Sequence, residues 1–577
     1  MSSADSLQSA QRAPKAPRPF DEDDEYGDAE KNFQPRSPRF WMIIIGMYAS
    51  IFLVALDRMI IATAIPGITN EFHSIEDIGW YGSAYMLTAA IFNPLFGRIY
   101  QLYSTKWVFL VSILVFEVGS ALCGAAPSSA AFIVGRAIAG IGAAGIFCGG
   151  IMIIVPLIPL RRRPIFTSFF GMAFGVSSVL GPLIGGTFTD NRSLTWRWCF
   201  YINLPIGGFT FVAILLFLHL KPPPREKLTV LDQLKRLDPF GLLFLIPSMV
   251  CLILALQWGN TTYPWSAPRI IGLLVTFAVL LVAFLAVEVL TPETAMAPTR
   301  VILNRSVGGS MLFMFLLSGG MMAVVYYLTI WFQAAQGQSA MEAGIRTIPL
   351  VLSLVVMGIV GAIFTESVGY YVPAMLLSPC LCAVGGGMLS TLTPSAGSSH
   401  WIGYQVIYGC GIGCGFQTSN LAPQTVLPRA DVPLGMALMF FMQQLGGSVF
   451  LSVGQNIFSS QLVDSISSVA GLNTEAIVNA GATAYRSMVP LGDLNTVINA
   501  YSYALTRVFI LTAALSACMI LGAGIVEWKS IKGKKSHPSK TDEANEGGKS
   551  EANEEGKREA NEENKNEAKN ESALGMD

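Results

Sequence analysis

The chain has 577 residues, of which 52% are hydrophobic and 13% carry a charge, whereas about 25% of residues are charged in soluble domains. Segments 1–39 and 527–577 contain 37 of the 75 charged residues, which leaves 38 for the 487 residues between them. So few charges cannot cover a surface in water, which excludes a soluble enzyme, a nucleic-acid binder and a fibrous chain. The net charge of −1 gives no basic field that would attract nucleic acid. We therefore expect the lipid bilayer to surround the central body.

The sequence predicts fourteen membrane-spanning helices, each of which takes about 20 mainly apolar residues, with twelve or thirteen helices as the alternative. Their apolar runs are continuous and lack the alternation of membrane-spanning strands, so the sequence predicts an all-α polytopic membrane protein. In chain order the predicted helices are 41–66, 79–99, 107–126, 130–157, 165–188, 201–220, 239–258, 269–290, 307–334, 343–364, 371–393, 401–422, 434–458 and 503–526.

The basic residues between these helices predict the orientation of the chain. With the N-terminus in the cytoplasm, the inward loops receive most of the arginines and lysines, as the positive-inside rule requires. An even number of helices then returns the C-terminus to the cytoplasm. The inward basic residues are Arg98, Lys106, Arg161, Arg162, Arg163, Lys221, Arg225, Lys227, Lys235, Arg236, Arg300, Arg305, Arg429, Lys529, Lys532, Lys534 and Lys535.

The polar ends of the chain are predicted to be cytosolic tails. Segments 1–39 and 527–577 contain too little apolar surface to fold, and the second repeats Glu543–Glu546 with an eight-residue period. Segment 221–238 is interpreted as a cytosolic linker. The tail segment 548–550 lacks the earlier glycine and the preceding strand of a phosphate-binding loop. The sequence therefore shows no ATPase.

Ionisable residues inside the predicted helices are costly in lipid, so each is a functional hypothesis. Asp57 and Arg58 lie in the first helix, Glu117 in the third and Arg136 in the fourth. Asp57 and Arg136 both fall in the outward half of their helices and could face each other. A carboxylate beside an arginine stays ionised, whereas displacement of the cation favours protonation, so this pair could load and release a proton.

Each of these four residues also has a purely structural explanation. A static bridge between helices explains Asp57 and Arg136 equally well. Arg58 points about 100° away from Asp57 on the helix, so it could snorkel or meet another helix. A neutral glutamic acid that hydrogen-bonds to a neighbour would account for Glu117.

Small residues give the fifth predicted helix a smooth face. Ser177, Gly181 and Gly185 recur every four residues, which allows close contact with another helix, and Gly186 follows them. Pro182 removes a backbone hydrogen bond, so we expect a bend there. A smooth, bent helix suits sliding contact between two states, although tight static packing would also explain it.

Uncharged polar residues in the later helices are weaker candidates for a substrate cavity, because most such groups hydrogen-bond between helices. These candidates are Gln417, Gln424, Gln443 and Gln444. We find no nucleophile–base spacing and no metal-ligand cluster, so the sequence predicts no catalytic residue, metal or cofactor. Asn191 and Asn260 begin sequons for glycosylation in outward loops close to the lipid.

Four motifs follow one another along the predicted helices. Leu56–Pro66 places an acid in the first helix, and Arg136–Gly142 places an arginine before glycines in the fourth. Gly181–Gly186 lies in the fifth helix, and Trp196–Gly208 leads into the sixth. In this order they resemble the acidic motif, the arginine motif, the antiporter motif and a further typical segment of the fourteen-helix drug:proton antiporter branch of the major facilitator superfamily, especially its fungal toxin and multidrug exporters. The resemblance covers residues 41–526.

The loop after the second predicted helix departs from the family pattern. Gly97 and Lys106 match the loop motif, but Gln101 stands where the pattern has an acid, and Ser104 stands where it has glycine. This difference calls into question a charge lock built on that acid. Ser177 also replaces a glycine of the fuller antiporter pattern, which exchanges one small residue for another.

The resemblance implies two six-helix bundles, 40–220 and 291–526, with two inserted helices in 239–290, that rock around a midplane cavity. It implies export of small amphipathic compounds, such as a secondary metabolite, toxin or drug, driven by inward proton flow with Arg136 taking part. One proton crossing 100 mV supplies about 2.3 kcal/mol, so a gradient can replace ATP. We expect a monomer in the plasma membrane, with the vacuolar membrane as the alternative.

Two other functions remain open at this stage. The chain could import a nutrient, a cationic amino acid or an iron chelate, which the direction of flux would reveal. It could also be a solute-sensing receptor that signals through its tail, in which case deletion of 530–577 would abolish function.

Overall fold

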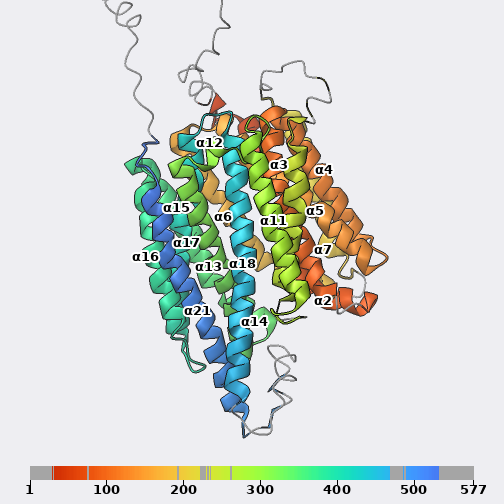
Figure 1. Ribbon diagram of the computed structural model, residues 1–577, viewed down its shortest axis with the longest axis vertical. Coiled ribbons are helices and arrows are strands. Elements are labelled where there is room, and N and C mark those ends of the chain that lie inside the picture. The colour runs from red at the N-terminus through yellow and green to blue at the C-terminus, as the bar shows by residue number, and fades with distance from the viewer. Residues whose placement is uncertain are drawn as a thin grey trace, which may run out of the picture. The chain divides into compact units, whose positions relative to one another are not determined.

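The computed structural model describes residues 32–73, 77–190, 194–220, 235–259, 263–467 and 492–531, with residues 29, 229, 233, 485, 486, 489 and 490. Within these ranges the chain is helical apart from loops and two isolated β-bridges (Figure 1). Twelve helical spans are long and apolar enough to cross a membrane. Helices α3 (Ile78–Leu102) and α17 (Ser398–Val426) have a comparable length and run beside them. The predicted all-α polytopic fold is confirmed.

The N-terminal bundle comprises α2 (Pro38–Phe72), α3, α4 (Thr105–Gly124), α5 (Ser129–Leu157), α6 (Arg163–Asp190), α7 (Trp198–Tyr201) and α8 (Asn203–Phe217). Helix α2 packs against α6 and α8, while α5 packs against α3 and α4. Glycine permits the closest of these contacts, because a Cβ on Gly142 of α5 would lie 2.7 Å from the Cα of Phe116 on α4. These close helix contacts leave Arg136 of α5 only 1% exposed inside the bundle.

The C-terminal bundle comprises α12 (Thr299–Ile302), α13 (Arg305–Ala334), α14 (Ala340–Arg346), α15 (Ile348–Val368), α16 (Val372–Leu389), α17, α18 (Val432–Ser467) and α21 (Leu494–Ile525). Helix α13 packs against α18 and α21, and α17 packs against α15 and α16. The two bundles meet where α3 contacts α18 and where α6 contacts α15. At the first contact, a Cβ on Gly97 would lie 2.6 Å from the Cβ of Ala437.

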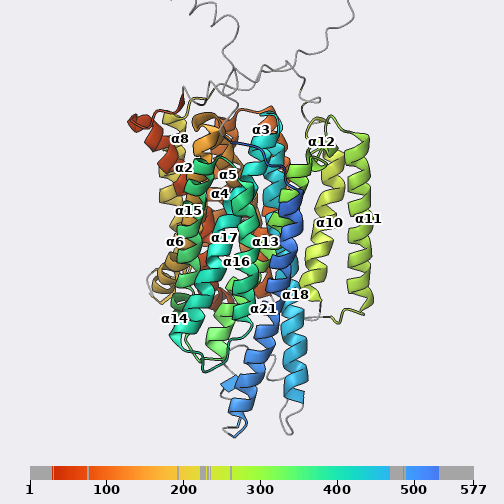
Figure 2. The same ribbon diagram turned by 90° about the vertical axis from the view of Figure 1, so that its left-hand side faces the viewer.

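Two further helices, α10 (Pro239–Trp258) and α11 (Pro268–Leu290), stand to one side of the bundles (Figure 2). Helix α10 contacts α3 and α18, and α11 packs against α10. Most of α11 is exposed, including Ile271, Val275, Val279 and Val282. An exposed apolar helix of this length is compatible with lipid and not with water, so α11 faces the bilayer.

Every predicted spanning segment overlaps a helix or a pair of consecutive helices, but some boundaries were wrong. Helix α18 continues to Ser467 beyond the predicted end at 458, and α21 begins at Leu494 before the predicted start at 503. Polar residues such as Gln461, Asp464 and Asn495 interrupt the apolar runs there without breaking the helices. The outward connection between these helices is therefore shorter than predicted.

Both predicted disordered tails were too long, because residues 32–39 and 527–531 belong to the folded part of the chain. The ring of Phe33 packs edge-on against Phe40, with centroids 5.5 Å apart, so the chain is already folded onto the bundle before residue 40. At the other end, Ile531 is 2% exposed and its N–H donates to the carbonyl of Gly369. The contacts of the partly buried Phe33 and the buried Ile531 offset the entropy cost of ordering these positions. The remainder of both tails lies outside the described residues.

Candidate functional site

An ion pair between Asp57 of α2 and Arg136 of α5 lies at the centre of the N-terminal bundle. The Arg136 Nη1 donates to Asp57 Oδ2 at 2.5 Å, and the two side chains are 1% and 0% exposed. The Arg136 Nε donates to the carbonyl of Tyr81 at 2.9 Å. Full burial makes the pair costly to break, because either charge left alone would be unsolvated. The structure thus joins two residues that the sequence placed at a similar depth.

Asn203, at the start of α8, completes the environment of the carboxylate. Its Nδ2 is 3.3 Å from Asp57 Oδ1 and 3.1 Å from the Oγ of Ser120 on α4. The short α7 ends at Tyr201 and α8 begins at Asn203, which turns this amide inward. The carboxylate is therefore held by a guanidinium on one oxygen and by an amide on the other.

Tyr85 of α3 separates the ion pair from a cavity between the two bundles. The guanidinium carbon of Arg136 lies 4.5 Å from the centre of the Tyr85 ring, and that of Arg58 lies 5.6 Å from it. The Tyr85 hydroxyl is 3.5 Å from the carbonyl of Val54. Tyr85 therefore lies both on the wall of the cavity and against Arg136 of the buried pair.

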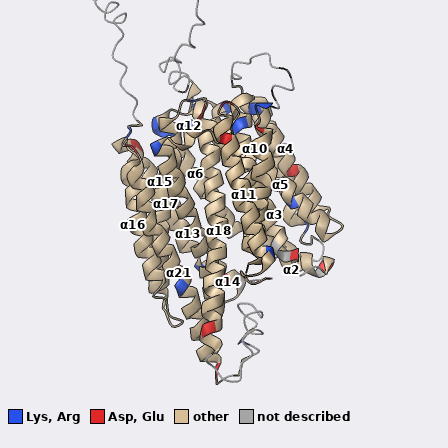
Figure 3. Ribbon diagram, in the orientation of Figure 1, with Lys and Arg blue, Asp and Glu red and all other residues tan. Residues whose placement is uncertain are grey.

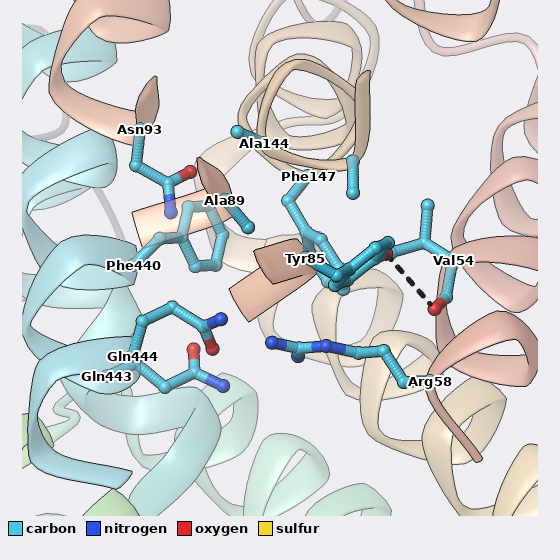
Figure 4. Close-up of a pocket in the computed structure, with 11 residues that line it drawn as sticks. Val54, Arg58, Tyr85, Ala89, Asn93, Ala144, Phe147, Phe440, Gln443 and Gln444 are labelled. Carbon is cyan, nitrogen blue, oxygen red and sulfur yellow. Dashed lines mark hydrogen bonds between the residues drawn. The ribbon is translucent and has the colours of Figure 1, made fainter. Parts of the chain in front are cut away.

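The cavity is open to solvent, contains about 320 Å³ of space that includes part of that solvent, and is lined from both bundles (Figure 4). Arg58, Tyr85 and Asn93 come from α2 and α3, whereas Phe440 and Gln443 come from α18. A second pocket of about 340 Å³ shares residues of α5 and α18 with the first and continues to α17. The shared residues are Phe147, Phe440 and Gln443. The two pockets therefore form one strip of aromatic rings and amides.

Three of the four candidate glutamines line this strip. Gln443 and Gln444 lie in the first pocket, and Gln417 lies in the second beside Asn420. Gln424 is absent from both linings, and its Nε2 donates to the carbonyl of Asn420 one turn earlier. Gln424 is therefore the one candidate glutamine that lines neither pocket.

Glu117 of α4 was predicted to hydrogen-bond to a neighbouring side chain as a neutral acid, and the described part of the structure shows no such bond. Both carboxyl oxygens are buried and lack a partner within the described structure. The carboxyl group packs onto the backbone at Gly207 of α8, where any side chain would overlap it. Glu117 is therefore held by packing alone, and it lines neither of the two pockets described above.

The small-residue face of α6 packs against α2. A Cβ on Gly181 would lie 2.8 Å from the Cβ of Met59, and one on Gly185 would overlap the hydroxyl of Thr63. Ser177 is fully buried, and its hydroxyl is 3.4 Å from the carbonyl of Phe52. Gly186, by contrast, has open space where a Cβ would lie. Helix α6 continues through Pro182, whose side chain lies outside those that the structure describes.

The loop motif forms a polar lock between the bundles even though Gln101 replaces the acid. The Arg98 Nη1 donates to Gln101 Oε1 at 2.5 Å, and Gln101 Nε2 donates to Asp431 Oδ1 at 3.1 Å. Asp431 also accepts two bonds from Arg300, at 3.0 and 3.1 Å. The acid of the lock thus comes from the C-terminal bundle. Lys106 takes no part in it, because its Nζ donates to the carbonyl of Leu215 within the N-terminal bundle.

We expect Asp431→Ala to loosen this end of the protein. Cys148 of α5 is 0% exposed and lies against the carbonyl of Pro433, two residues after Asp431, so it reports on this contact between the bundles. Removing the carboxylate should raise the rate of maleimide labelling of Cys148 roughly threefold, the effect of losing a partly exposed ion pair. Peptide mapping by mass spectrometry measures that rate. Asp464→Ala, which removes an exposed carboxylate from α18 itself, should leave it unchanged, and equal rates in both variants would contradict the lock.

A second polar cluster lies at the other end of α2, outside the apolar span. Arg197 donates to Glu71 Oε1 at 2.6 Å and to the carbonyls of Gly124 and Ala126, and the Trp196 Nε1 donates to Glu71 Oε2 at 2.7 Å. Desolvation opposes ionisation of Glu71, but the bonds from Arg197 and Trp196 outweigh it and lower its pKa below the ordinary 4.5. The cluster gives Trp196 and Arg197 of the motif at 196–208 a structural role, because both side chains donate hydrogen bonds to the carboxylate of Glu71.

Acid is expected to weaken this cluster. Because the folded-state pKa of Glu71 is lowered, its contribution to stability is complete above the ordinary value and is lost as the pH falls through the lowered one. The thermal midpoint of the wild type should therefore fall more steeply below pH 4.5 than that of Glu71→Gln. Glu342→Gln is a matched control, since that carboxylate is also 44% exposed in an arginine pair. A Glu71→Gln profile parallel to the wild type would disprove this contribution.

Several residues of the site were not singled out from the sequence. Asn203 lies inside the motif at 196–208, which could have marked it as a candidate. Its contact with Asp57, however, depends on the break between α7 and α8. Tyr85 and Asp431 belong to no motif, and nothing in the sequence distinguishes them. Asn191 and Asn260 lie outside the described residues, and the described part of the chain contains no group of His, Cys, Asp and Glu that could hold a metal ion.

A buried ion pair beside a cavity that two helix bundles share is the arrangement of a membrane transporter. The profile of the Major Facilitator Superfamily matches residues 47–451. The chain is 48% identical over 503 residues to the MFS-type efflux pump MFS1 of Trichophyton rubrum, which covers 86% of this chain and 93% of that protein. It is 45% identical over 508 residues to the efflux pump aflT of Aspergillus parasiticus, with 87% and 98% covered. The chain belongs to the Major Facilitator Superfamily.

Solved structures share the fold at low sequence identity. The human organic anion transporter MFSD10 (TETRAN) is 15% identical with a TM-score of 0.53, covering 83% of this chain and all of that one. The proton:xylose symporter XylE is also 15% identical, with a TM-score of 0.52 and 83% and 96% covered. These similarities support the fold, and the resemblance to fungal efflux transporters is confirmed by the closer relatives.

Proposed function

We propose that this protein exports small amphipathic compounds by alternating access and that a proton moving inward drives each cycle. The observation that carries the proposal is the Asp57–Arg136 pair, fully buried and one aromatic ring away from the cavity between the bundles. A carboxylate held by a cation gives up its charge only when that cation is displaced. Helix movement that displaces Arg136 would therefore favour proton uptake, and its return would favour proton release.

Export as the direction of transport is supported by the relatives, which are described as efflux pumps. The orientation is supported by the charge distribution, because most blue basic residues in Figure 3 gather at the end that carries α12. By the positive-inside rule that end faces the cytoplasm. We infer a monomer in the plasma membrane that uses the proton gradient and no bound cofactor.

The experiment is reconstitution of the full chain into liposomes that contain a fluorescent pH indicator. Addition of a transported amphipathic compound to one side should move protons in the opposite direction, and an imposed pH gradient should drive accumulation of the compound. A panel of aromatic and aliphatic compounds that produces neither response would refute proton-coupled export. Compound movement that is independent of the pH gradient would show that the protein is a transporter but that protons do not drive it.

A further inference from the structure

Arg58 is the one charged residue that lines the two pockets, and the described structure gives it no counter-ion. Its neighbour Asp57 is already paired with Arg136. The Nε of Arg58 is buried and makes no hydrogen bond, and the guanidinium lies 5.6 Å from the centre of the Tyr85 ring. The charges of Asp57 and Arg136 cancel each other, so the positive charge of Arg58 on the cavity wall has no counter-charge of its own.

Arg58 is partly exposed to the cavity, but a guanidinium without a counter-ion inside the bundle is still costly. Removing a cation from water costs several kcal/mol unless an opposite charge or hydrogen-bond acceptors replace the lost solvation. A ring face such as that of Tyr85 contributes only about 0.5–2 kcal/mol. Arg58 therefore binds most favourably to a compound that brings an oxygen acceptor into the cavity.

The other walls indicate the shape of that compound. Figure 4 shows the guanidinium of Arg58 extending from α2 toward the amides of Gln443 and Gln444, with the ring of Tyr85 beside it. The rings of Phe147 and Phe440 stand above, with centroids 5.7 Å apart. The strip continues to Phe174, whose ring stacks on Phe147 at 5.5 Å. Flat aromatic surfaces with amides at the edge fit a flat ring system whose oxygens lie on its rim.

We propose that Arg58 is a substrate-binding and specificity-determining residue, which selects flat aromatic compounds carrying a phenolate or carboxylate oxygen and rejects lipophilic cations. This inference rests on the proposed function, because it assigns the substrate class of the exporter. The anionic oxygen contacts the Arg58 guanidinium, the aromatic body lies along Phe147 and Phe440, and the amides of α18 meet the remaining polar groups.

The charges also limit how substrate and proton can be coupled. A proton on Asp57 would release Arg136 and add positive charge beside the cavity, which favours an anion instead of expelling it. Direct charge competition therefore cannot release the substrate. Release comes from separation of the bundles, because Arg58 belongs to the N-terminal bundle and Gln443 to the C-terminal one.

Binding of two dyes that share one ring system tests the proposal. Fluorescein and a cationic rhodamine ester are both xanthene dyes, and anisotropy with the purified full chain gives a dissociation constant for each. The wild type should bind fluorescein at least about tenfold more tightly than the rhodamine, which corresponds to 1.4 kcal/mol. Arg58→Gln should remove that preference, and Arg58→Lys should retain part of it. Arg161→Gln, at an exposed arginine outside both pockets, should bind both dyes like the wild type.

Equal affinity of the wild type for both dyes, no binding of either, or an unchanged preference in Arg58→Gln would overturn the inference. A thermal unfolding curve for each variant shows whether a loss of binding reflects loss of the fold, in which case Arg58→Lys decides. Failure of the proposed function has a different signature. The dyes would bind with the expected preference, yet a pH gradient across liposomes would move neither of them.

Discussion

Asp57→Asn is expected to abolish proton-driven export, lowering the rate by about a hundredfold or more. The amide cannot exchange a proton, and Arg136 is left as an unpaired buried cation, a loss worth about 3–5 kcal/mol in other buried pairs. Both side chains are at most 1% exposed, so water cannot compensate. The measurement is accumulation of a transported compound in liposomes under an imposed pH gradient. Glu117→Gln is the matched control, because that buried acid has no hydrogen-bond partner among the described residues, and it should retain export within about twofold of wild type.

A double variant separates proton exchange from a static bridge. Asp57→Asn combined with Arg136→Gln removes both charges, so it should recover much of the thermal stability that the single variant loses. If the pair only holds α2 and α5 together, export should recover along with stability. Our proposal requires that export remain absent in the stable double variant. Recovery of pH-driven export there would rule out a role for Asp57 in proton exchange.

Gly181→Val is expected to lower export at least about tenfold by blocking the contact between α6 and α2. A Cβ at this position would already lie 2.8 Å from the Cβ of Met59 and 3.1 Å from its backbone, so the helices must separate to admit valine. Overpacking of this kind typically costs about 1–3 kcal/mol. Export assays and thermal unfolding measure the two consequences.

Another glycine of the same motif offers a direct control for this prediction. Gly186→Val places the same side chain on the same helix, but no atom lies within 4 Å of the new Cβ. It should leave export and the unfolding midpoint close to wild type, apart from a small effect of the side chain on the helix itself. Equal losses in both variants would mean that the antiporter motif acts through the glycine backbone and not through its contact with α2.

The fold was predictable because its determinants are local. Continuous apolar runs revealed the spanning segments, and only their ends were misplaced, where polar residues such as Asp464 continue α18 beyond the apolar stretch. The site was predictable in part. Asp57 and Arg136 could be matched in depth from helix rise alone, whereas the rotation that turns Arg58 away from Asp57 and into the cavity could not be fixed without the neighbouring helices.

The amino-acid sequence by itself determined that this is an all-α, multi-pass membrane protein and which few charges lie within its helices, because apolar length and charge placement are properties of single segments. The tertiary structure alone decided which partner each charge has. It assigned Asn203 to Asp57, placed Tyr85 between the ion pair and the cavity, and supplied Asp431 as the acid of the loop contact. These contacts join residues far apart in the chain, and they depend on the rotation and spacing of packed helices, which no local pattern specifies.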